Sequence, residues 1–236
     1  VELMQHIQTV RGDLLTDAGR SSEAAEAYAN AGSSDALHAA AVASFNAGDA
    51  ARSLELAETA IAQGKQEPPV LLTRAEALFE LDRHAEAIPS YEAVLQSDAT
   101  DLHARAASRL AWCHYIEGRV PSAANIFAQI VRDHPDSPEA EEASYMEGRS
   151  WKEGGNDAAA VTAWETYVAR FPEGEHTAEV LMSLSEITGG ADARKHLATL
   201  ARDHGESPLV TRALLDLADG LTDEGNMEQA EQHYSD

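Results

Sequence analysis

The chain has 236 residues, a formal net charge of −24 and a pI near 4.6. This acidity disfavours nucleic acid as a partner, because phosphate binding needs a basic surface. No stretch reaches the roughly 18 consecutive apolar residues of a membrane span, so direct membrane insertion is not expected. The single Cys113 excludes an internal disulfide and is interpreted as a buried core thiol.

A short pattern recurs roughly every 34 to 37 residues along the chain. It consists of a small residue, an aromatic residue or leucine four positions later and often a proline eight positions after that. Clear copies are Ala87 with Tyr91, Ala123 with Phe127 and Pro135, and Ala160 with Trp164 and Pro172. About seven copies cover nearly the whole sequence, which predicts stacked repeats in place of one globular core.

Each repeat is predicted to be two antiparallel helices, because apolar residues recur at intervals of three and four and glycine separates the two halves. The first helices are expected to start near Gln5, Ser34, Pro68, Ala104, Glu141, Gly174 and Thr211. Turns within the repeats are expected at Gly19, Gly48, Asp82, Gly118, Gly155, Thr188 and Gly225. Small residues at facing positions, such as Gly12, Ala41, Ala75, Ala111 and Gly148, let the paired helices approach closely.

The repeats are expected to form a single continuous domain over residues 1–236. Runs rich in proline, glycine and charge at 63–69, 134–138 and 171–176 are interpreted as turns between repeats, because the spacing resumes after each. The pattern is already under way near Val1 and is still incomplete at Asp236. We therefore expect a fragment of a longer protein, with its last repeat truncated.

The pattern resembles the tetratricopeptide repeat, which has small residues about positions 8 and 20, an aromatic about position 24 and a proline about position 32. The match is best at Ala75, Ala87 and Tyr91; at Ala111, Ala123, Phe127 and Pro135; and at Gly148, Ala160, Trp164 and Pro172. The resemblance implies an all-α, right-handed superhelical solenoid of antiparallel helix pairs.

In that family the first helices line a concave surface that binds partners. The resemblance therefore implies a groove here, and its candidate contact residues are Phe45, Phe79, Arg105, Trp112, Tyr115, Tyr145, Arg149, Lys152 and Met182. The wider set of matched positions includes Asp35, His38, Val42, Asn46, Leu72, Glu76, Glu80, Ser108, Ile116, Glu142, Glu153, Glu175, Ser185 and Glu186.

Aromatic and arginine side chains are frequent interface anchors, so the expected partner is a peptide or protein segment with apolar anchors and a carboxylate. In the alternative interpretation, Trp112 and Tyr115 pack on the neighbouring first helix, and the cations pair with Glu142 and Glu153. The family's Lys–Asn–Arg clamp for chaperone tails is not matched, because its positions hold Leu72, Glu76, Arg109, Glu142 and Met146.

The sequence segments 133–140 and 170–174 resemble segments of bacterial cell-envelope repeat proteins, namely the Tol-Pal-associated periplasmic coordinator and the outer-membrane assembly lipoprotein. The resemblance favours the bacterial periplasm or envelope over the cytoplasm. Segments of this composition also occur in general where one helix ends and the next begins.

Catalytic and metal-binding patterns are absent from the sequence. The ten histidines are scattered, and no pair has the spacing of a helical zinc site. They are His6, His38, His84, His103, His114, His134, His176, His196, His204 and His233. No phosphate-binding glycine loop or nucleophile elbow occurs. We therefore expect no enzyme, no cofactor and no metal site within these residues.

The acidic composition has three interpretations. Lysine occurs only at Lys65, Lys152 and Lys195, and scarce lysine on an acidic surface is typical of adaptation to high salt. The alternatives are an acidic face for a basic partner and a solvated, self-repelling surface.

The sequence thus predicts a non-enzymatic scaffold that binds a peptide or protein in a groove and is monomeric on its own. One alternative is a structural spacer or self-association platform in a cell-envelope or secretion assembly. A weaker alternative is a regulatory domain of an enzyme whose catalytic part lies outside this sequence.

Overall fold

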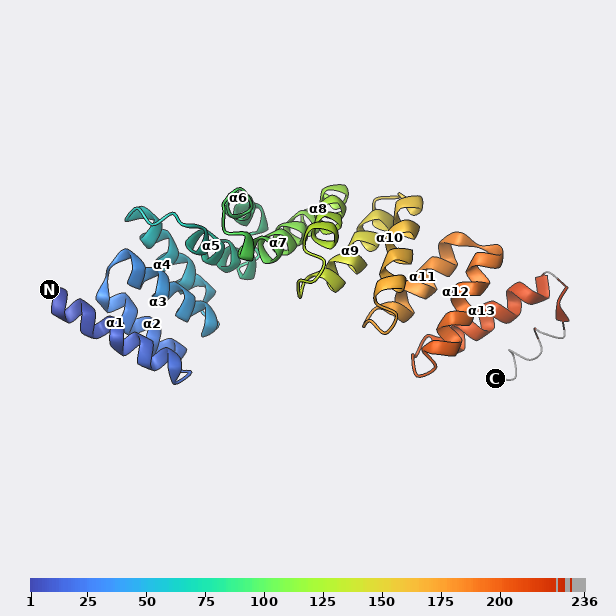
Figure 1. Cartoon of the computed structure of the whole chain (residues 1–236), viewed down its shortest axis with the longest axis horizontal. Helices are drawn as coiled ribbons and strands as arrows, with labels where there is room; N and C mark the ends of the chain where they lie inside the picture. The colour runs from blue at the N-terminus through green and yellow to red at the C-terminus, as the bar shows by residue number, and fades with distance from the viewer. Residues whose placement is uncertain (224, 228–229, 231–236) are drawn as a thin grey trace. The chain divides into compact units, whose positions relative to one another are not determined.

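The computed structural model describes residues 1–223, 225–227 and 230, and these residues form α-helices, one short 3-10 helix and connecting turns (Figure 1). The helices from α1 to α7 are α1 (Glu2–Asp17), α2 (Ser21–Ala31), α3 (Ser34–Asn46), α4 (Ala50–Ala62), α5 (Pro68–Glu80), α6 (His84–Leu95), η1 (Thr100–Leu102) and α7 (His103–Ile116). The remaining helices are α8 (Val120–Asp133), α9 (Ala140–Glu153), α10 (Asp157–Arg170), α11 (Thr177–Thr188), α12 (Gly190–Asp203) and α13 (Val210–Asp223).

The chain divides into two compact parts, an N-terminal unit (Val1–Ile126) and a C-terminal unit (Phe127–Asp236). The dividing point lies within α8. The single continuous domain expected from the repeat spacing stays a prediction. His233 and the end of the last repeat lie outside the described residues.

Each helix from α1 to α7 in the N-terminal unit packs against the next one along the chain, and so does each helix from α9 to α13 in the C-terminal unit. The first helices also contact each other in the N-terminal unit, where α3 touches α5 and α5 touches α7. This arrangement of helix pairs stacked in chain order confirms the predicted all-α fold of a helical-repeat solenoid. It also places the first helices α3, α5 and α7 side by side, where they share one surface.

The turns within the repeats use the left-handed backbone conformation. Positive φ angles occur at the predicted residues Gly19, Gly48, Asp82, Gly118, Gly155 and Gly225. The turn predicted at Thr188 is wrong, because Thr188 ends α11 and the left-handed residues are Gly189 and Gly190. A β-branched residue such as threonine is strained at positive φ, so the chain turns at the glycines that follow.

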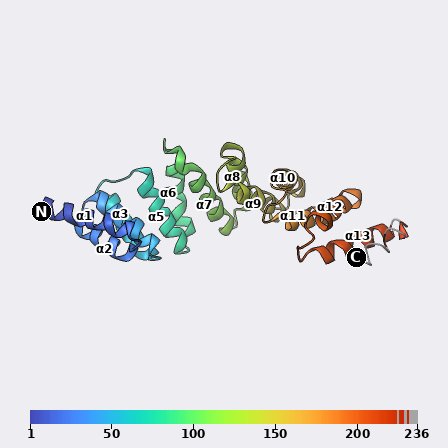
Figure 2. The same cartoon turned by 60° about the horizontal axis from the view of Figure 1, so that its bottom comes forward.

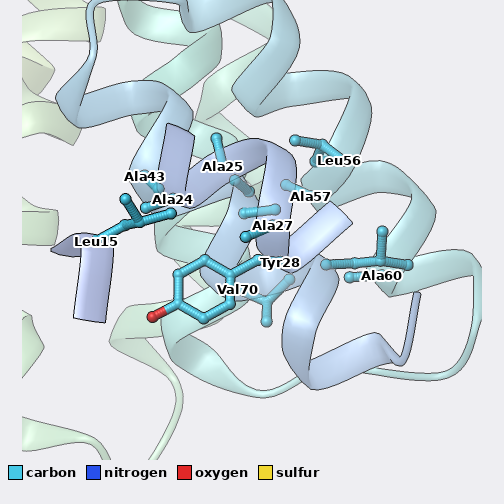
Figure 3. Packing of buried hydrophobic residues seen from close by; sticks show 13 residues of the cluster. Leu15, Ala24, Ala25, Ala27, Tyr28, Ala43, Leu56, Ala57, Ala60 and Val70 are labelled. Carbon is cyan, nitrogen blue, oxygen red and sulfur yellow. The ribbon is translucent and has the colours of Figure 1, made fainter. Parts of the chain in front are cut away.

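Small side chains bring the paired helices close together in the N-terminal unit. Figure 3 shows Tyr28 within a buried cluster that is mostly alanine, including Ala24, Ala27 and Ala57. A Cβ atom at Gly12 would overlap the Tyr28 ring, so the absence of a side chain there is needed for this packing. The next cluster contains Cys113, which is fully buried and confirms the interpretation of a core thiol.

The C-terminal unit has its own core, which joins α11, α12 and α13 through Leu181, Met182, Leu197, Leu200 and Leu217. Burial of leucine and methionine side chains contributes about 1.5–3 kcal/mol each, so this cluster stabilises the contacts among the three helices. Among the described residues, no helix combines the length and apolar character needed to cross a membrane.

Candidate functional site

A pocket of about 370 Å³ opens on the surface formed by the first helices of the N-terminal unit. In Figure 2, α5 lies between α3 and α7. All three helices contribute residues to the pocket. Its lining consists of His38, Val42, Phe45 and Asn46 of α3; Pro69, Leu72, Thr73 and Glu76 of α5; Leu102 of η1; and Arg105 of α7. Residues from three successive repeats therefore form this pocket.

The pocket has an apolar wall. Val42 is 38% exposed, and Phe45 is half-buried because it packs against the core cluster that contains Leu72. The half-buried Leu102 packs against the same cluster. An apolar side chain of a partner could remove this surface from water, which is favourable in proportion to the area covered.

A charged pair lies beside the apolar wall. Glu76 is buried, and its Oε1 is 2.5 Å from Nε of Arg105, whose side chain is more than half exposed. The pKa of Glu76 is raised overall, because the effect of burial is larger than the opposite effect of the nearby Arg105 and Arg109. A guanidinium has five N–H donors in a planar fork, so Arg105 can contact Glu76 and also present donors toward solvent.

His38 is fixed by a hydrogen-bond chain at the other side of the pocket. Thr73 Oγ1 donates to the carbonyl oxygen of Pro69 at 3.0 Å, and His38 Nε2 is 3.1 Å from the same Oγ1. A hydroxyl has only one proton to donate, so Oγ1 accepts from His38 and the hydrogen lies on Nε2. Burial, followed by the charge of Lys65, lowers the pKa of His38 and favours its neutral form.

The other aromatic candidates of this unit lie outside the pocket. Phe79 is half-buried, with the Arg109 guanidinium 4.8 Å from its ring centre and His84 packed edge-on at 4.8 Å. Trp112 and Tyr115 are both half-buried on α7, and their rings meet edge to face with centroids 5.6 Å apart. The structure thus brings only Phe45 and Arg105 of the five candidates of this unit into the pocket.

Tyr145 is a buried member of the C-terminal unit. Its hydroxyl donates to Glu179 Oε1 at 2.7 Å, and its ring stacks on His176 with centroids 4.0 Å apart. Burial and then the Glu179 carboxylate raise the pKa of Tyr145 to about 12. Arg149 Nη1 lies 3.5 Å from the same hydroxyl oxygen. The phenol is therefore held in place by residues of its own chain.

The candidate cations of this unit have carboxylate partners within the chain. Arg149 Nε lies 3.2 Å from Glu153 Oε1, which confirms the alternative interpretation for this pair. Lys152 Nζ lies 3.3 Å from Glu186 Oε2 and 5.7 Å from the centre of the Trp164 ring. Tyr145, Arg149 and Lys152 are thus close together along α9, whereas Met182 is buried in the core of the unit.

A second pocket of about 570 Å³ in the C-terminal unit is acidic, with four glutamates among its lining residues Pro138, Glu141, Glu142, Glu173, Gly174, Glu175 and His176. Glu141 Oε1 accepts hydrogen bonds from the Tyr167 hydroxyl at 3.1 Å and from the backbone N–H of Glu175 at 3.0 Å. Across the described part of the chain, no group of three or more histidine, cysteine or carboxylate side chains is arranged to hold a metal ion.

Three pocket residues fell outside the candidate set from the sequence. Pro69 occupies the same repeat position as Asp35 but was not among the candidates, whereas Thr73 and Leu102 lie at other positions, and Leu102 belongs to the short η1 helix between repeats. The sequence signal that could have drawn attention to this place is the Pro68–Pro69 pair, because proline is favoured at the start of a helix and so marks where α5 begins.

Comparison with known proteins gave one family match. The family model described as tetratricopeptide repeat matches residues 72–138 and 117–175. No curated protein sequence matches the chain.

Solved structures share the fold. The C-terminal part of a TPR repeat-containing protein from Cytophaga hutchinsonii superposes with a TM-score of 0.71 at 14% identity, covering 95% of this chain and 93% of that one. A structure of MamA gives a TM-score of 0.64 at 16% identity over 75% of this chain and 94% of that one. YrrB, described as a TPR protein with an unusual peptide-binding site, gives 0.61 at 17% identity over 70% of this chain and 86% of that one.

Proposed function

This chain is a tetratricopeptide repeat protein, and we propose that it is a non-enzymatic scaffold that binds a peptide or protein segment. The fold supports protein–protein interaction in general, because a row of first helices offers an extended surface for a partner. We place the centre of recognition at the pocket formed by α3, α5 and α7. YrrB, which has the same fold, is described as carrying a peptide-binding site.

The observation that carries this proposal is the pairing of an apolar wall with an exposed guanidinium in one pocket. An apolar side chain of the partner would pack on Val42 and Phe45. A carboxylate or carbonyl oxygen of the partner would accept hydrogen bonds from Arg105, whose Nε already contacts Glu76. Anchors of this kind, close to the centre of a contact surface, typically provide most of the binding energy.

The C-terminal unit supports the proposal less directly. Its cations Arg149 and Lys152 already have carboxylates of the same chain close by, so a partner would have to compete with Glu153 and Glu186. Exchange of one exposed ion pair for another changes the free energy little. We therefore assign this unit a secondary role in binding.

The test is a selection of peptides from a display library, followed by calorimetric titration of the selected peptides. Val42→Glu puts a charge on the apolar wall and should weaken binding at least about tenfold, which corresponds to about 1.4 kcal/mol. Leu215→Glu is the matched control, because Leu215 is similarly exposed but belongs to α13 and does not line the pocket. Equal affinity of the two variants, both folded, would contradict the assignment of the pocket.

A further inference from the structure

The pocket formed by α3, α5 and α7 contains a carboxylate of its own beside the guanidinium that faces a partner. The side chain of Glu76 is 10% exposed, whereas that of Arg105 is 55% exposed. A partner that enters the pocket therefore meets the guanidinium first. Because Arg105 Nε already contacts Glu76, a carboxylate that binds the other N–H groups of Arg105 would share this guanidinium with Glu76.

A carboxylate is the partner group that suits Arg105 best. Its two oxygens can accept two parallel N–H bonds from the planar guanidinium, whereas a carbonyl group offers a single oxygen. A lysine or arginine of the partner would be repelled by Arg105 before it reached the buried Glu76. The geometry of the pair thus favours an acidic side chain of the partner at this place.

The binding of a second carboxylate changes the charge balance of the pair. Glu76 and Arg105 neutralise each other, so an added carboxylate leaves one negative charge without compensation. A like charge nearby raises the pKa of a carboxyl group, and burial has the same effect. Burial already raises the pKa of Glu76 above its ordinary value. A proton on Glu76 would restore the balance when the partner binds.

The other charged or titratable groups around Glu76 come from α5 itself and from the helices that pack against it. Arg109 of α7 lowers the pKa of Glu76, while the exposed Glu80, one turn along α5, raises it. The charge of Glu76 in turn acts on the buried phenol of Tyr91 in α6. On α4, Glu58 contacts Arg74 of α5 at 3.4 Å. His38 of α3 lines the same pocket.

His38 is the second group in this pocket that could take up a proton near neutral pH. Its Nε2–H donates to Thr73, so a proton would have to go to Nδ1. Burial lowers the pKa of His38, which makes the uptake of a proton there less favourable. Glu76 has the opposite tendency and contacts the group that the partner binds.

We propose that the pocket binds an acidic side chain of its partner together with a proton, and that Glu76 takes up this proton. The proposal rests on the proposed function, because it concerns the same pocket. Binding and protonation then strengthen each other, as linkage requires. The affinity for an acidic segment rises as the pH falls from about 7.5 to about 5.5, and it decreases again near pH 4, where the partner's own carboxylate becomes protonated.

Selection of peptides from a random display library at about pH 5.5 and about pH 7.5 tests the chemistry of the partner. The unaltered chain should enrich peptides with aspartate or glutamate beside an apolar residue more strongly at the lower pH. Glu76→Gln should enrich them equally at both. Glu92→Gln is the matched control and should behave like the unaltered chain, because it removes an exposed carboxylate of the same unit that does not line the pocket.

Calorimetric titration in two buffers that differ in their enthalpy of ionisation tests the uptake of the proton. The probe is a selected acidic peptide whose binding Val42→Glu weakens. The unaltered chain should take up protons on binding and bind this peptide at least about threefold more tightly at the lower pH. Glu76→Gln should lose both effects, whereas His38→Gln should still take up protons. A peptide with the acidic residue replaced by its amide should bind without proton uptake, and this comparison needs no protein variant.

Three results would overturn the proposal and leave the proposed function in place. They are pocket-binding peptides without enrichment of acidic residues, binding of the acidic peptide without proton uptake, and proton uptake that His38→Gln removes but Glu76→Gln keeps. A selection in which Val42→Glu weakens no peptide would contradict the proposed function itself, and this inference with it.

Discussion

Gly148 of α9 lies directly against the indole ring of Trp164 of α10, so closely that a Cβ atom at Gly148 would overlap Cδ1 and Nε1 of the ring. The indole N–H donates to the backbone carbonyl oxygen of Tyr145 at 3.1 Å, which fixes the ring in this position. Glycine therefore determines how closely α9 and α10 approach.

Gly148→Ala should lower the free energy of unfolding by about 1–3 kcal/mol, because the added methyl group overpacks the interface. Gly220→Ala is the matched control, since Gly220 also lies inside a helix but a Cβ there would meet only Arg194 Cγ at 4.0 Å. Alanine in that helix should stabilise by up to about 1 kcal/mol. Chemical denaturation of both variants measures the two values, and equal effects would contradict the packing argument.

Asp82 adopts φ +57°, although it has a side chain. The left-handed conformation is energetically less favourable for a β-branched residue than for aspartate. Glycine adopts it without a steric clash. Asp82→Gly should thus be more stable than Asp82→Val by about 1–2 kcal/mol. Thermal unfolding of the two variants checks the order, and a more stable valine variant would show that the turn rearranges.

The pKa of Glu76 is raised by burial above its value in the unfolded chain. The folded state then binds more protons than the unfolded state between the two pKa values, so this group contributes more stability as the pH falls from 7 toward about 4.5. Glu76→Gln lacks the titration. The stability of the glutamine variant relative to the unaltered chain should decrease over this pH range, as measured by denaturation at several pH values. A constant difference would show that Glu76 keeps its ordinary pKa.

Trp112 stays a predicted contact residue, one that lies on α7 beyond the pocket. If the bound segment continues from Arg105 along this helix, Trp112→Ala should weaken binding by at least about 2 kcal/mol, as expected for a central aromatic anchor. Its effect on unfolding should be much smaller, because the ring is only half-buried. Calorimetric titration and denaturation of the same variant separate the two effects, and similar losses in both would make Trp112 a packing residue.

Cys113 should resist thiol reagents in the folded chain. Burial, followed by the neighbouring Glu117 carboxylate, raises the pKa of its thiol to about 12, and the thiolate is the reactive form. At pH 8 a chromogenic disulfide reagent should label it only slowly, and complete labelling should follow in denaturant. Rapid labelling without denaturant would reveal local opening around α7.

The repeat spacing predicted the helix pairs and even the non-glycine turn at Asp82, because periodicity and turn position are local properties of the sequence. The turn that it predicted at Thr188 was wrong, because the chain turns at the adjacent Gly189 and Gly190, where a positive φ angle causes less backbone strain than at threonine. The contact between Glu76 and Arg105 was not predictable from repeat positions, because it depends on side-chain direction and burial. Met182 illustrates the same limit, since its burial requires α12 and α13 to cover it.

The contacts that hold each unit together join helices that are neighbours, or next but one, along the chain. Every such contact closes a short stretch of polypeptide, so little chain entropy is lost before packing begins. Proteins dominated by contacts of this kind fold fast. During synthesis, α1 and α2 can therefore pair as soon as both have left the ribosome, and each later helix finds its docking surface already formed.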